Sequence, residues 1–182
     1  MKLLLTSTGL ENPALRRAFV RLLPCEAANA RALFIPTAAV NCDAIEVLPK
    51  CLEDLYGIGI RRENIVVYDL HTPMTEAEIA AYDCVYLCGG DTKYLAKRVK
   101  EARFGAVLKA YLAAGRGAVL GVSAGSMIFS AAQDAGIDLL PQALQVHCAQ
   151  GSADGALPPD AVRLTNAQGI LFEGENAPFI LE

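Results

Sequence analysis

The chain has 182 residues, a net charge of −4 and no Trp. This length suits one domain over residues 1–182, and no apolar run approaches the ~20 residues that a membrane-spanning helix needs. Lysine and arginine are spread along the chain instead of clustered, so we expect neither nucleic acid nor a membrane as a partner.

Short apolar runs alternate with longer helical patterns along most of the chain. This alternation predicts an α/β fold, a three-layer α/β/α sandwich around a mostly parallel central sheet. In chain order we expect strand 2–6, helix 12–23, strand 31–35, helix 43–56, strand 65–69, a short helix from 75, strand 84–88, a helix after 92, helix 104–114, strand 117–122 and helix 124–132. Shorter strands then follow at 144–147, 162–164, 170–172 and 179–181.

A Gly-Val-Ser-Ala-Gly turn at 121–125 lies directly between an expected strand and an expected helix. In this setting a G-x-S-x-G motif holds its serine on a tight, strained turn at the carboxyl edge of a sheet, with the hydroxyl exposed. The start of the next helix stabilises a developing oxyanion, and the amide of Ala124 is the first available donor. We therefore predict Ser123 as a nucleophile; the alternative is a serine that only caps the helix.

A second glycine-rich turn, Gly89-Gly90-Asp91, follows strand 84–88. It falls on the same carboxyl edge, which is where α/β sheets bind ligands. Two glycines let backbone amides approach a substrate carbonyl closely, so we expect Gly90 to form an oxyanion hole together with Ala124. The alternative is that the glycines only make the turn while Asp91 or Thr92 caps the following helix.

A serine nucleophile needs a base, and the chain has only two histidines, His71 and His147. His147 is the expected base, because it follows the serine as in elbow hydrolases with the order Ser, acid, His. Two carboxylates stand between Ser123 and His147, namely Asp134 and Asp138. Asp134 is preferred as the acid that orients the imidazole, because it comes directly after the helix behind the serine; Asp138 stays open as the alternative.

The six cysteines contain no C-x-x-C pair, and two histidines offer no ligand cluster at zinc spacing. We therefore expect no metal and no cofactor. We expect the cysteines to be reduced thiols. The only candidate for an export signal is interrupted by Arg21, Pro24 and Glu26. A cytoplasmic location follows as the expectation.

Five segments, spread in order over nearly the whole chain, carry a family resemblance. They are FIPTA at 34–38, YLCGGDT at 86–92, GVSAGS at 121–126, DLLP at 138–141 leading to His147, and LTNAQGIL at 164–171. With them the chain resembles the peptidase E (aspartyl dipeptidase) and cyanophycinase-like serine peptidases, whose fold is similar to that of class I glutamine amidotransferases.

The resemblance implies hydrolysis of small peptides by Ser123 with His147 as base and an acid to orient it, and it leaves a homodimer open. After the histidine, family members commonly continue with an aromatic residue and an arginine-containing stretch. This chain has Cys148-Ala149-Gln150-Gly151-Ser152 there, which removes one candidate for binding an acidic substrate side chain.

Two other functions compete with a peptidase. A small esterase of the α/β-hydrolase type shares the serine turn, but such domains usually exceed this length and carry a His-Gly-Gly-type oxyanion loop that is absent here. A catalytically silent amidotransferase-like domain that binds a ligand or a partner is the second alternative.

Overall fold

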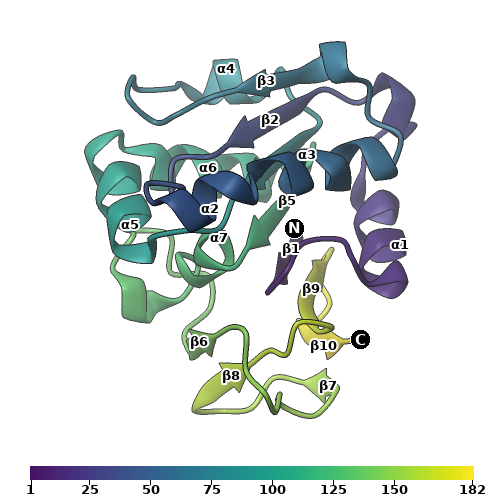
Figure 1. Ribbon diagram of the computed structural model, residues 1–182, viewed down its shortest axis with the longest axis vertical. Coiled ribbons are helices and arrows are strands. Elements are labelled where there is room, and N and C mark those ends of the chain that lie inside the picture. The colour runs from purple at the N-terminus through teal and green to yellow at the C-terminus, as the bar shows by residue number, and fades with distance from the viewer.

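The computed structural model describes all 182 residues and is built around one large sheet. Its strands are β1 Lys2–Thr6, β2 Ala32–Ile35, β3 Ile65–Val67, β4 Cys84–Leu87, β5 Ala118–Val122, β7 Gly155–Ala156, β9 Gly169–Glu173 and β10 Phe179–Leu181. Their spatial order is β3-β2-β4-β5-β1-β9-β10-β7 (Figure 1). The strands from β3 to β1 pair in parallel and the others antiparallel, so the sheet is mostly parallel as predicted.

Helices cover both faces of this sheet and complete three layers. They are α1 Pro13–Leu22, α2 Cys42–Glu46, α3 Leu48–Gly57, α4 Glu76–Ile79, α5 Thr92–Glu101, α6 Phe104–Ala114 and α7 Ala124–Met127. Buried residues of α1 and α3 share one apolar core with the sheet, and those of α4 to α7 share the other. No helix of the structure is long and apolar enough to span a bilayer.

The two cores follow from the side-chain alternation of buried strands. Along β1, Leu4 enters the core under α1 and α3, while Leu3 and Leu5 enter the opposite core. Because both faces are covered, the strand carries three consecutive leucines instead of alternating apolar and polar residues. The same feature makes β4 and β5 fully buried, so the turns at their carboxyl ends rest on a rigid base.

A second, two-stranded sheet lies beyond the serine turn. It pairs β6 Ala143–Gln145 in parallel with β8 Ala161–Arg163, and Leu144 stands opposite Val162. Both of these side chains are buried in the core on the α4 to α7 side. This small sheet places the late part of the chain beside the functional site.

Three elements of the structure differ from the expectation. The helix expected at 43–56 is divided into α2 and α3, because Pro49 has no amide hydrogen to continue the first helix and occupies the first turn of the second. The helix expected at 124–132 ends at Met127. Ser130 is extended there, caps a 3-10 turn at Ala131–Gln133 and bridges to Leu140. Strand β7 was not expected.

Candidate active site

Ser123 occupies a strained turn between β5 and α7. Its backbone has φ 52° and ψ −112°, a combination that non-glycine residues rarely adopt and that is typical of functional turns. The turn is held from both sides, since the Ser123 amide donates to Thr6 O at 2.9 Å and its carbonyl accepts from the Ser126 amide at 2.9 Å. The Ser123 side chain makes no capping hydrogen bond to α7, which rules out the capping alternative.

The glycines of the turn allow α7 to lie directly against the strands. A Cβ on Gly125 would stand 2.2 Å from the carbonyl oxygen of Leu87, and one on Gly121 would stand 2.6 Å from the Gly125 carbonyl. Ser126 adds a buried clasp, because its hydroxyl donates to Thr6 O at 2.7 Å and accepts from the Thr6 amide at 2.9 Å. The nucleophile is therefore placed by backbone contacts that no larger residue permits.

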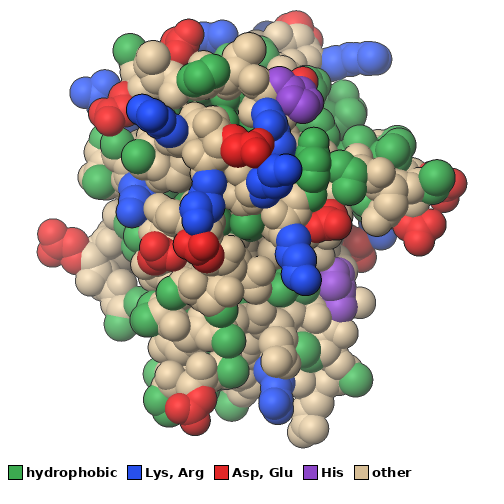
Figure 2. Space-filling model, turned by 90° about the vertical axis from the view of Figure 1, so that its left-hand side faces the viewer, with side chains coloured by type: hydrophobic (Ala, Val, Ile, Leu, Met, Phe, Trp, Pro, Cys, Tyr) green, Lys and Arg blue, Asp and Glu red, His purple; other side chains and the backbone are tan.

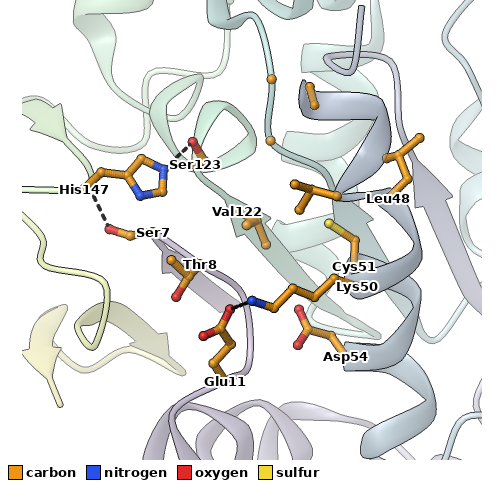
Figure 3. Close-up of a pocket in the computed structure, with 14 residues that line it drawn as sticks. Ser7, Thr8, Glu11, Leu48, Lys50, Cys51, Asp54, Val122, Ser123 and His147 are labelled. Carbon is orange, nitrogen blue, oxygen red and sulfur yellow. Dashed lines mark hydrogen bonds and ion pairs between the residues drawn. The ribbon is translucent and has the colours of Figure 1, made fainter. Parts of the chain in front are cut away.

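His147 lies two residues beyond β6 and reaches back to the serine. Its Nε2 is 2.9 Å from Ser123 Oγ, within hydrogen-bond distance, and Figure 3 shows the ring directed at that hydroxyl. The His147 backbone has φ 57°, and its amide donates to Ser7 Oγ at 3.3 Å. Ser7 directly follows β1, so the central sheet itself positions the base.

The second ring nitrogen of His147 faces an amide instead of a carboxylate. His147 Nδ1 is 2.9 Å from Asn166 Oδ1. Because that oxygen only accepts, the proton lies on Nδ1 and leaves Nε2 free to accept from Ser123. Asn166 is held in turn by Thr8, whose hydroxyl donates to the Asn166 carbonyl at 2.8 Å. Sequence reasoning missed Asn166, although its polar Thr165-Asn166-Ala167-Gln168 turn directly after a late strand was a usable signal.

The preference for Asp134 as the orienting acid was wrong. Its carboxylate is 2.7 Å from Lys100 Nζ on α5 and its side chain is 87% exposed. The physical reason is that α7 ends early, so the chain turns toward α5 and carries Asp134 with it. Asp138 is exposed and makes no hydrogen bond to His147 either.

The other histidine belongs to a different part of the surface. His71 Nδ1 is 3.1 Å from Arg98 Nη2 and His71 Nε2 is 3.8 Å from Asp69. Figure 2 shows the two histidine side chains at separate places on one face, with acidic and basic side chains mixed between them. Of the two histidines, only His147 is hydrogen-bonded to Ser123.

The two amides expected to bind an oxyanion are free of other protein acceptors. Neither the Gly90 amide nor the Ala124 amide donates a hydrogen bond within the structure. Gly90 has φ 139°, and a Cβ there would stand 2.0 Å from the Ala38 carbonyl oxygen, so this position requires glycine. A Cβ on neighbouring Gly89 would stand 3.1 Å from Ser123 Cβ, which shows how closely the two turns approach.

A cavity of about 260 Å³ opens beside Ser123 and His147. Figure 3 shows it between the segment after β1 on one side and α3 on the other, with Val122 on its floor. This volume is at the low end for ligand pockets, which typically hold several hundred Å³, and it fits a small ligand. The site therefore combines a strained serine, a bonded histidine, two free amides and a small adjoining cavity.

Residues 3–143 match the model of peptidase family S51. The chain belongs to this family. The matched region contains Gly90 and Ser123 but ends before His147 and Asn166, so the geometry alone brings these two residues into the site. S51 membership makes the protein a peptidase. No curated protein matches the chain.

Solved structures share the fold of this S51 peptidase at low sequence identity. A protein provisionally assigned as peptidase E from Listeria monocytogenes EGD-e superposes with a TM-score of 0.72 at 20% identity, covering 100% of this chain and 98% of that one. A peptidase from an acI-B1 Actinobacterium gives 0.67 at 19% identity, covering 98% and 86%. These likenesses establish the three-layer architecture.

Proposed function

We propose that this S51 peptidase is a serine-type enzyme that hydrolyses small peptides in the cytoplasm, with Ser123 as nucleophile and His147 as base. The observation that carries the proposal is the 2.9 Å contact between His147 Nε2 and Ser123 Oγ on a strained turn. A serine hydroxyl is a weak nucleophile unless an adjacent base accepts its proton, and this pairing provides one.

The proposed reaction begins when Ser123 Oγ attacks the scissile carbonyl carbon and its proton passes to His147 Nε2. The carbonyl oxygen gains negative charge, which the free amides of Gly90 and Ala124 stabilise by hydrogen bonds. The C–N bond then breaks, and His147 returns the proton to the leaving amine. Water repeats the sequence on the acyl-enzyme, so the acid product leaves and the serine is restored.

Asn166 is the proposed positioning residue of this reaction. Its Oδ1 fixes the ring orientation and the Nδ1–H tautomer of His147, as the carboxylate does in Ser-His-Asp enzymes. An amide carries no charge, so it stabilises the protonated imidazole less than a carboxylate would. We therefore expect slower acylation than in a carboxylate triad.

A fluorophosphonate probe tests the proposal directly, because only an activated serine reacts quickly with it. We expect stoichiometric labelling, with the adduct on the peptide that contains Ser123, together with hydrolysis of dipeptides. Loss of dipeptide hydrolysis in the labelled protein would show that labelling and hydrolysis use the same site. An intact, folded protein that remains unlabelled would contradict the proposal and favour a silent ligand-binding domain.

Substitution of Asn166 separates orientation from charge. Asn166→Leu removes the acceptor and is expected to lower kcat by roughly 10- to 100-fold, a loss of about 1.5–3 kcal/mol. Asn166→Asp keeps the acceptor and adds a charge, so kcat is expected to equal or exceed that of the wild type, with the acid limb of the pH-rate profile shifted to higher pH. If Asn166 had only a structural role, the pH-rate profile would not shift and aspartate would not restore kcat.

A further inference from the structure

The cavity beside Ser123 has an apolar wall and a charged far end. Ala44, Val47 and Leu48, around the junction of α2 and α3, line it together with Val122. Figure 3 shows Glu11, Lys50 and Asp54 grouped at the end away from His147. A substrate whose acyl residue enters this cavity from Ser123 would pass along the apolar wall and reach these charges.

An ammonium group already lies at this end of the cavity. Lys50 Nζ is 2.5 Å from Glu11 Oε1. The hydrogen bond and the charge of Glu11 raise the pKa of Lys50, and the charge of Asp54 acts in the same direction. The Lys50 side chain is 60% exposed, so it can turn away from Glu11 at little cost. This end of the cavity thus already pairs a positive charge with a carboxylate.

Asp54 gives this end a second, more permanent acceptor. The residue is only 8% exposed, and its Oδ2 accepts a hydrogen bond from the Tyr86 hydroxyl at 2.7 Å. Burial raises the pKa of Asp54, against the effect of the Tyr86 hydrogen bond. A cation placed beside this carboxyl would favour its ionised form, because an opposite charge at short range outweighs part of the desolvation cost.

From these contacts we infer that Glu11 and Asp54 bind the side-chain ammonium group of the residue whose carbonyl Ser123 attacks. The inference rests on the proposed serine peptidase function and names its substrate class: small peptides whose first residue carries a lysine-like side chain. An acidic side chain would meet two carboxylates and a single lysine that Glu11 already occupies. The alkyl part of the residue packs on Val47, Leu48 and Val122.

Matched dipeptides with leucine as second residue test this subsite. The first residue is lysine, norleucine or glutamate, and the lysine and norleucine peptides are also made with an acetylated N-terminus. We expect kcat/KM for each lysine peptide to exceed that of the norleucine peptide with the same N-terminus by roughly tenfold, the scale of one charge-assisted hydrogen bond. Lysine is thus preferred with or without acetylation, and a preference for a free N-terminus without any preference for lysine would overturn the inference.

Variants locate the preference within the cavity. Glu11→Gln is expected to abolish it, whereas Glu53→Gln, an equal charge change at an exposed site on α3 outside the cavity, leaves it intact. Lys50→Met removes the ammonium group that competes for Glu11, and it is expected to lower the Kd of the lysine peptides by roughly threefold or more. A preference for the glutamate peptide, or a preference unchanged in Glu11→Gln, would overturn the inference.

Binding to the Ser123→Ala protein, measured by calorimetry with the same peptides, separates this inference from the proposed function. One outcome is that the wild type hydrolyses none of the peptides, but the lysine peptides bind with a lower Kd than the norleucine peptides and this difference depends on Glu11. The subsite then stands and the peptidase mechanism fails. If the wild type hydrolyses the peptides but the lysine and norleucine peptides bind with equal Kd, the mechanism stands and the subsite fails.

Discussion

Replacement of Ser123 by alanine is expected to lower kcat for dipeptide hydrolysis on the order of 10⁶-fold, the scale of losing a serine nucleophile. The fold should persist, because the Ser123 backbone bonds to Thr6 and Ser126 remain and its side chain bonds only to His147. Hydrolysis of a dipeptide followed by chromatography, together with fluorophosphonate labelling and a urea unfolding curve, measures all three properties.

The neighbouring Ser126 provides the contrasting variant. Its hydroxyl is buried and bonded twice to the Thr6 backbone, so Ser126→Ala is expected to reduce the free energy of unfolding. The Ser126→Ala protein that remains folded should still be labelled at Ser123. Full labelling of the Ser123→Ala protein, or labelling that depends on Ser126 instead, would show that the nucleophile lies elsewhere.

His147→Ala is expected to lower kcat by at least about three orders of magnitude, because nothing else in the structure accepts the Ser123 proton. The fluorophosphonate labelling rate should fall in parallel, since it depends on the same activation. Rates at saturating substrate, with KM determined separately, distinguish this loss from weaker binding.

His71→Ala is the matched control, since it removes the only other imidazole. His71 contacts Arg98 and Asp69 and has no bond to the serine, so its loss should change kcat less than twofold. A large loss in His71→Ala with an active His147→Ala protein would contradict the assignment of the base.

The serine turn was readable from the sequence because every signal for it is local. A buried strand, a G-x-S-x-G motif and a helix follow one another with no spare residue, so only one backbone path is open to Ser123. The positions of the first five strands along the chain and the glycine turn after β4 follow from similarly short segments. Such features need no knowledge of distant contacts.

The partner of His147 could not be read in the same way. Asn166 reaches the ring because β6 pairs with β8, and because Cys148 N donates to Leu164 O at 3.0 Å. These strands are three residues long, and no local periodicity reveals that they pair. The prediction of a carboxylate before His147 also assumed a chain order of Ser, acid, His, whereas the structure has the order Ser, His, Asn.

The pairing of β6 with β8 also means that the site draws on two sheets. His147 and Asn166 follow the strands of the small sheet, whereas Ser123 and the free amides of Gly90 and Ala124 follow strands of the large one. Two adjacent residues after β1 connect these parts. Ser7 donates to Leu164 O and accepts from the His147 amide, and Thr8 donates to the Asn166 carbonyl. The same short segment of the large sheet therefore holds both the histidine and its amide partner in place relative to Ser123.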